Sequence, residues 1–180
     1  MFSPSGDRSN GAAADSTPPG PQRYAYFPVV RFGFGTAVGR GATSPTEAGF
    51  AFDLTAGLLA HQDRRGLQFM PEVGVSYQGG PTPGGTYFTA GLSALYGTRL
   101  FSGGLGARGM LGGSSAGLAA GVRSGLVLQA FFTSFTLDLG YQLLPTATDN
   151  RHAFVATLSV NPVPLIAGLF FFNALLGRWR

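Results

Sequence analysis

The sequence contains no cysteine and no lysine, and only 11% of its 180 residues are charged. Without cysteine, neither a disulfide framework nor a thiolate metal site is possible. The share of charged residues is less than half of the share that a soluble globular domain usually has. Because a soluble domain needs charge to cover its surface, this shortage indicates that much of the surface does not face water.

Positive charge is also thin. All 12 basic residues are arginine, the formal net charge is +4, and the arginines are scattered along the chain. A dense basic run, which is typical of proteins that follow a phosphate backbone, is missing. We therefore expect no nucleic-acid partner.

Long hydrophobic runs are missing as well. The longest uninterrupted apolar run covers residues 163–172, and a helix needs roughly 18–20 apolar residues to cross a bilayer. Residues 1–22 contain no apolar core of the kind found in signal peptides, and their Pro/Ser/Gly content predicts a disordered linker. If the protein is exported, we expect its signal peptide to have been removed.

Instead of long apolar runs, the sequence has segments in which apolar and polar residues alternate. In LQFMPEVGVSYQ, residues 67–78, apolar Phe69, Val73 and Val75 share one face, and Glu72 lies on the other. This two-residue period is typical of a β-strand. Seven further segments alternate in the same way, at residues 24–38, 49–62, 88–97, 101–111, 117–129, 131–143 and 152–161.

Each segment has about the 9–11 residues that a tilted strand needs to cross a bilayer. We therefore predict an all-β fold, an antiparallel up-and-down transmembrane barrel of about eight strands, over residues 23–161. The apolar tail, residues 162–180, is expected to be an interfacial segment or a closing strand. Two places fit less well. No turn-forming residue separates the sixth and seventh segments, and Pro71 calls for a bulge in the third.

The polar faces carry mainly small residues, with isolated charges near the middle of most segments. Small residues suit the narrow interior of an eight-stranded barrel. We predict that the apolar faces contact lipid and that the charges pair inside the lumen, Asp138 with Arg123 and Glu72 with Arg108 or Arg123. The predicted lumen charge network consists of Arg31, Asp53, Glu72, Arg108, Arg123 and Asp138.

In strand number, alternation, inward small and charged residues and aromatic segment ends, residues 23–161 resemble the small eight-stranded outer-membrane β-barrels of Gram-negative bacteria. This is the architecture of the OmpA transmembrane domain and of OmpX. The resemblance implies a bacterial outer-membrane location. One departure is that such barrels usually end on an aromatic residue of the last strand, whereas this chain continues for about 20 residues.

Catalytic motifs are weak. The glycines of FGFGTAVGRG (Gly33, Gly35 and Gly39) lack the spacing of a dinucleotide-binding loop. His61 and His152 are expected at opposite mouths of the barrel, and neither has a nucleophile at close spacing. We therefore expect no enzymatic activity, no cofactor and no metal site.

Three functions follow from this interpretation. The first is a structural or interaction role, in which a monomer contacts outer-membrane lipid and its outward loops contact unknown ligands or envelope proteins. The second is a narrow channel or a conduit for small hydrophobic molecules. The third is a soluble barrel that binds an apolar ligand. In the soluble barrel the apolar faces would point inward.

Overall fold

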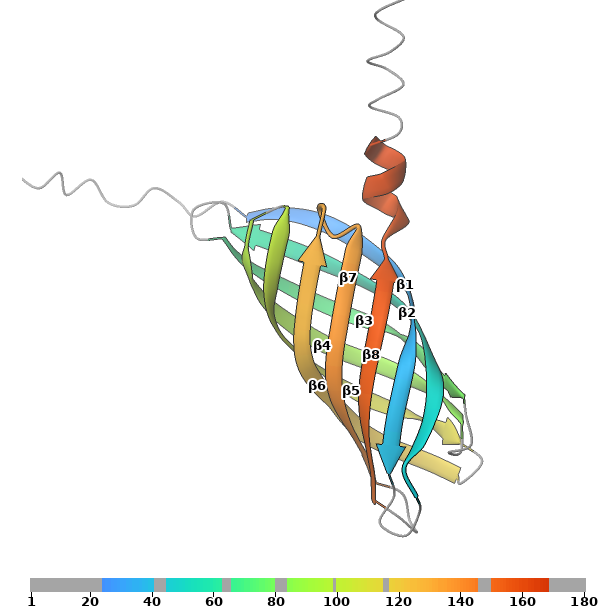
Figure 1. Ribbon diagram of the computed structural model, residues 1–180. Coiled ribbons are helices and arrows are strands. Elements are labelled where there is room, and N and C mark those ends of the chain that lie inside the picture. Colours follow the sequence, from blue (N-terminus) through green and yellow to red (C-terminus); the bar gives the residue numbers. More distant parts are fainter. Residues whose placement is uncertain are drawn as a thin grey trace, which may run out of the picture.

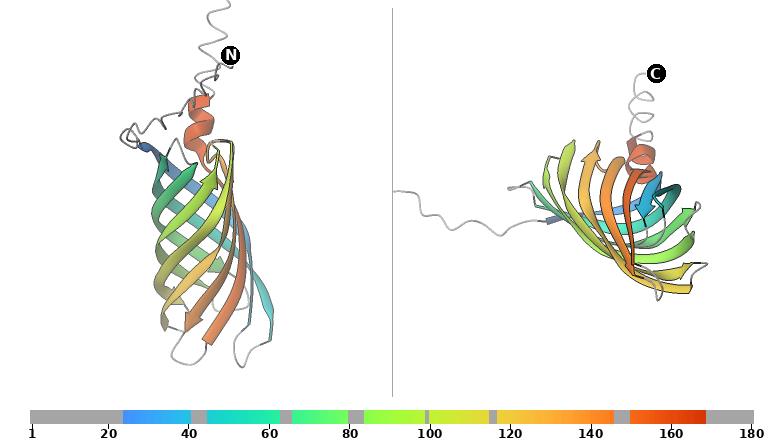
Figure 2. Two further views of the ribbon diagram at one scale, coloured as in Figure 1. Left: turned by 90° about the vertical axis from the view of Figure 1, so that its left-hand side faces the viewer. Right: turned by 60° about the horizontal axis from the view of Figure 1, so that its bottom comes forward.

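The structure, a computed structural model, describes residues 24–40, 45–62, 66–79, 84–98, 100–114, 117–145 and 150–168. Within these ranges the chain forms a closed barrel of eight antiparallel strands in sequence order, with β8 paired to β1 (Figures 1 and 2). The strands are β1 (Tyr24–Arg40), β2 (Glu47–Gln62), β3 (Leu67–Gly79), β4 (Gly85–Gly97), β5 (Phe101–Ser114), β6 (Gly117–Ala130), β7 (Phe135–Pro145) and β8 (Asn150–Val160). The predicted fold class and strand number are confirmed. The predicted linker, residues 1–22, lies outside the described residues.

The two ends of the barrel differ. β1 begins and β8 ends at one mouth, here called the terminal end, where β2, β4 and β6 also end. The opposite mouth, the loop end, is where β1, β3, β5 and β7 end. Residues 162–168 form a short helix that follows β8 at the terminal end (Figure 1). In the part of the chain that the structure describes, no helix is long and apolar enough to cross a membrane.

Strand register fixes the tilt of the barrel. Tyr24 on β1 pairs with Gln62 on β2. Following the partner of each residue from strand to strand around the barrel leads to Leu158 on β8, which pairs with Phe34 on β1, ten residues beyond Tyr24. This shift is the shear that an eight-stranded sheet needs to close with strongly tilted strands. It also determines which residues face one another across the lumen.

The apolar faces point outward. Leu105, Leu118 and Phe154 are each at least 70% exposed, and Leu54, Val73 and Leu92 on the mid-strand apolar faces are exposed too. Alternate positions are buried inside, with one apolar cluster near the terminal end (Val29, Leu59, Met70) and another near the loop end (Tyr87, Met110, Ala119, Leu144). This orientation is the reverse of a soluble barrel.

Aromatic side chains collect at both rims of this apolar exterior. Near the loop end Phe50 packs on Tyr77 and Tyr141 packs on Phe154, and near the terminal end Phe101 packs on Phe131. Such belts are typical of the two membrane–water interfaces. The aromatic segment ends of the sequence therefore lie at both rims.

Two local predictions were wrong. Pro71 needs no bulge, because the register between β2 and β3 is the same on both sides of it, and pairing is interrupted only at Leu58 and Leu59 opposite Pro71 and Met70. The seventh strand begins at Phe135 rather than at residue 131. Residues 131–134 form a turn in which Phe131, Phe132 and Thr133 all have positive φ values of 52–69°. Such values are rare for these residue types, so their sequence carries no turn signal.

Candidate functional site: the lumen charge network

Six charged side chains meet at mid-height in the lumen, between the two apolar clusters. All six are at least 94% buried, and they come from β1, β2, β3, β5, β6 and β7. They are Arg31, Asp53, Glu72, Arg108, Arg123 and Asp138. A buried charge is strongly unfavourable without a partner, so the pairing within the network decides whether the barrel can fold around it.

The ion pairs form an alternating chain. Glu72 binds Arg31 and Arg108 through its two carboxylate oxygens, and Arg108 also binds Asp138. Arg123 Nη2 lies 3.8 Å from Asp138 Oδ2 and 2.6 Å from Asp53 Oδ2. Three guanidinium groups and three carboxylates therefore neutralise one another within the lumen.

Hydroxyl groups bind two ends of this chain. Arg31 Nε donates to Thr55 Oγ1 at 3.2 Å, and Thr157 Oγ1 donates to Asp53 Oδ2 at 3.3 Å. These bonds connect β1 to β2 and β8 to β2, so the network crosses the closing contact of the barrel. Hydrogen bonds of this kind reduce the free-energy cost of burying an ionic cluster.

The pairing differs from the expected one in detail. Glu72 was expected to reach Arg108 or Arg123, and it reaches Arg108 together with Arg31. Asp138 was expected to pair with Arg123 on the neighbouring strand, but its closer partner is Arg108. Arg108 and Arg123 are direct cross-strand partners, and like charges at such positions repel. Asp138 lies within ion-pair distance of both, which offsets that repulsion.

Glycines beside the arginines make room for these long side chains. A Cβ at Gly91 would lie 2.5 Å from Arg108 Cγ, and a Cβ at Gly140 would lie 3.0 Å from Arg123 Cγ. Gly91 is also the cross-strand partner of both Glu72 and Arg108. The absence of a side chain there lets these two charged groups meet over the strand between them.

A second polar contact closes the lumen near the loop end, and the sequence did not predict it. Gln78 Nε2 donates to Gln142 Oε1 at 2.7 Å, and Gln142 Nε2 donates to Gln78 Oε1 at 3.0 Å. β3 and β7 lie on different sides of the barrel, so this reciprocal amide pair bridges the lumen. Both residues lie on polar faces in the sequence, but only the shear brings them together.

The two histidines lie at opposite mouths, as expected. His61 lies on β2 near the terminal end, and His152 lies on β8 near the loop end, where Tyr141 Oη is 2.5 Å from its Nδ1. Among the described residues, no three His, Cys, Asp or Glu side chains come together to hold a metal ion. Gly33, Gly35 and Gly39 lie within β1 rather than in a phosphate-binding loop.

An apolar exterior around a charged, side-chain-filled interior defines an eight-stranded transmembrane β-barrel. A comparison with protein-family models gives no match, and neither does a comparison with curated proteins. Among solved structures, the crystal structure of Neisserial surface protein A (NspA) matches 76% of this chain and 98% of its own, with 20% identity and a TM-score of 0.44. The crystal structure of Ail, the attachment invasion locus protein of Yersinia pestis, matches 74% of this chain and 97% of its own, with 10% identity and a TM-score of 0.42.

Proposed function

We propose that this protein is a monomeric, non-conducting barrel of the bacterial outer membrane, with a structural or interaction role and without catalytic chemistry. The observation that supports this most strongly is the neutralised charge network, which fills the lumen between two apolar clusters. A barrel of eight strands has an interior just wide enough for side chains to fill. The Gln78–Gln142 pair adds a second layer across the same path.

The apolar exterior and the filled interior leave the two rims as the surfaces that reach water. Both termini of the barrel lie at one rim. In outer-membrane barrels the shorter turns face the periplasm. The longest stretch between two strands, residues 41–46, joins the end of β1 to the start of β2, and these strand ends lie at the other rim. We therefore place the terminal end in the periplasm and the contact surface for an envelope partner at the loop end, where Arg40, Glu47 and His152 lie.

The non-conducting role predicts an electrical result. Purified protein in planar bilayers is expected to give no steady single-channel steps, because the six charges are held in mutual ion pairs rather than lining a water-filled path. Heat-modifiable migration on a gel provides the control that the protein is folded. Regular conductance steps from folded protein would support the narrow channel instead.

The orientation predicts a labelling pattern. Because the chain has no cysteine of its own, single substitutions give specific labels. Glu47→Cys at the loop end is expected to react with a membrane-impermeant maleimide on intact cells. Thr98→Cys at the terminal end is expected to react only after the outer membrane is permeabilised. The opposite pattern would place the loop end in the periplasm, and labelling of neither variant on intact cells would argue against the location.

A further inference from the structure

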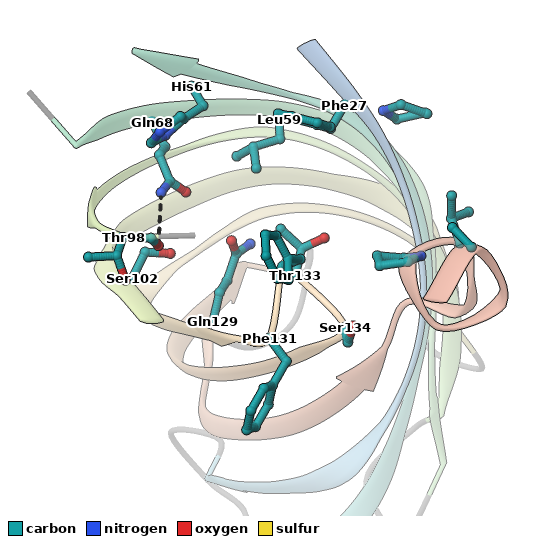
Figure 3. Close-up of a pocket in the computed structure, with 15 residues that line it drawn as sticks. Phe27, Leu59, His61, Gln68, Thr98, Ser102, Gln129, Phe131, Thr133 and Ser134 are labelled. Carbon is teal, nitrogen blue, oxygen red and sulfur yellow. Dashed lines mark hydrogen bonds between the residues drawn. The ribbon is translucent and has the colours of Figure 1, made fainter. Parts of the chain in front are cut away.

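A cavity of about 460 Å³ lies at the terminal end, between the mouth of the barrel and the helix at residues 162–168 (Figure 3). We call it the terminal cavity. Its volume is within the range of small-molecule sites. Apolar walls come from Phe27, Leu59 and Val163, and polar groups come from His61, Gln68 and Gln129. None of the described residues that line it is an Asp, Glu, Lys or Arg.

One wall of the terminal cavity is not a hydrogen-bonded strand. β1 pairs with β8 only from Phe32 to Arg40, so residues 24–31 of β1 extend beyond the end of β8. Residues 161–168 follow β8 at this end, and Val163, Pro164 and Ala167 line the cavity together with Phe27 and Pro28 of β1. A wall made by packing alone can open without breaking a strand pair. It adjoins the apolar exterior, because Tyr26, Phe27 and Ile166 are all exposed.

The interior of the cavity offers an unused hydrogen-bond acceptor. Gln129 is only 4% exposed, and its side chain points into the mouth (Figure 3). Its Nε2 lies 3.5 Å from the sulfur of Met70, whereas its Oε1 is buried without a hydrogen-bond partner. A buried acceptor without a donor is costly. A ligand with a hydroxyl or an amide N–H would satisfy it.

The turn beside Gln129 is held in a strained conformation. Phe131, Phe132 and Thr133 have positive φ values. Asn161 Nδ2 donates to Thr133 Oγ1 at 3.0 Å, and the Asn161 backbone N–H donates to the Ser134 carbonyl at 2.8 Å. Backbone strain of this kind is concentrated at ligand clamps and active sites. Here it fixes the turn, and with it the end of β6, against the cavity.

We propose that the terminal cavity binds a neutral single-chain amphiphile from the adjoining membrane leaflet. The ligand donates a hydroxyl or amide hydrogen to Gln129 Oε1, and its chain packs against Phe27, Leu59 and Val163. None of the described lining residues is an Asp, Glu, Lys or Arg, which favours a neutral head over a phosphate or carboxylate. The site depends on the barrel lying in a membrane, but not on an interaction role at the loop end.

The test uses the full chain in lipid nanodiscs and two matched probes, 1-dodecanol and dodecyl methyl ether. The ether has a similar chain and lacks the donor. Binding is followed by the backbone amide NMR shifts of Thr133 and Val163, with protein-free nanodiscs as the reference for partitioning into lipid. We expect saturable binding of the alcohol, about tenfold tighter than binding of the ether, which is the effect of one hydrogen bond. Gln129→Leu is expected to make the two probes bind equally.

Two variants of the helix locate the site. Ala167→Trp is expected to abolish binding by filling the cavity, whereas Ile166→Trp, at a neighbouring position that does not line it, is expected to leave binding unchanged. Heat-modifiable migration shows for each variant that the barrel is folded. Absence of saturable binding to the wild type would overturn the proposal. So would an alcohol preference that persists in Gln129→Leu, or binding that survives in Ala167→Trp. If the terminal cavity does not bind the alcohol, the expected conductance and labelling results are unaffected, so the two proposals are tested separately.

Discussion

Replacing Glu72 with glutamine is expected to lower the free energy of unfolding by about 3–5 kcal/mol, which is typical when one partner of a buried ionic cluster is removed. The reason is that this one carboxylate binds both Arg31 and Arg108. Without it, Arg31 keeps only its hydrogen bond to Thr55 among the contacts described above. Unfolding in urea, followed by heat-modifiable migration on gels, gives the free-energy difference.

Glu47→Gln is the matched control, because the same change is made at the start of β2, outside the network. We expect it to change the unfolding free energy by less than about 0.5 kcal/mol, as for most surface substitutions. Glu72→Gln with a stability equal to that of Glu47→Gln would show that the carboxylate is not paired inside the barrel.

Double-mutant cycles test which arginines Glu72 contacts. Replacing Arg31 or Arg108 with methionine in the Glu72→Gln background is expected to recover part of the loss, because Arg31 has then lost its ion pair to Glu72 and Arg108 keeps only its ion pair to Asp138. Arg123→Met is expected to recover none of it, since Arg123 binds Asp53 and Asp138 instead. Equal coupling to all three arginines would contradict the alternating chain of ion pairs.

The faces of the strands could be predicted from the sequence, whereas the partners across the lumen could be predicted only in part. Alternation by two places Glu72 and Arg31 on inward faces whatever the register. Which charges then meet depends on the ten-residue shear between Tyr24 and Phe34, and this shear accumulates over all eight strand pairs. The prediction that Asp138 pairs with Arg123 took only neighbouring strands into account. The contact of Arg108 with Asp138, two strands away, therefore escaped it, whereas Glu72 with Arg108 was among the expected pairs.

The turn at residues 131–134 escaped prediction for a different reason. Turn signals come from residues that adopt left-handed conformations at little cost, such as glycine and asparagine. Phe131, Phe132 and Thr133 are not of this kind, and their conformation is held from outside by Asn161, beyond the end of β8. Gln129, next to this turn, lies on a polar face like many other residues. Nothing in the local sequence marks its oxygen as unpaired.

The second large effect on stability is expected for a substitution on the apolar exterior of the barrel. Leu92→Arg should lower the free energy of unfolding by about 2–4 kcal/mol when the barrel is in lipid vesicles, because the charge would lie near the bilayer midplane. Leu92 is half exposed in the middle of β4, on an apolar face between Pro71 and Ala107. Reversible urea unfolding in vesicles measures the difference.

Leu118→Arg is the matched control, because Leu118 is also an outward leucine but lies at the start of β6, near the rim. Its expected cost is about 0–1 kcal/mol, since the penalty for arginine falls toward the interface. Spin labels at Leu54, Val73 and Leu92 give an independent readout. We expect them to be relaxed by oxygen and shielded from a polar nickel chelate. Equal costs for the two leucines, together with access of the chelate to these labels, would show that the apolar exterior does not lie in hydrocarbon.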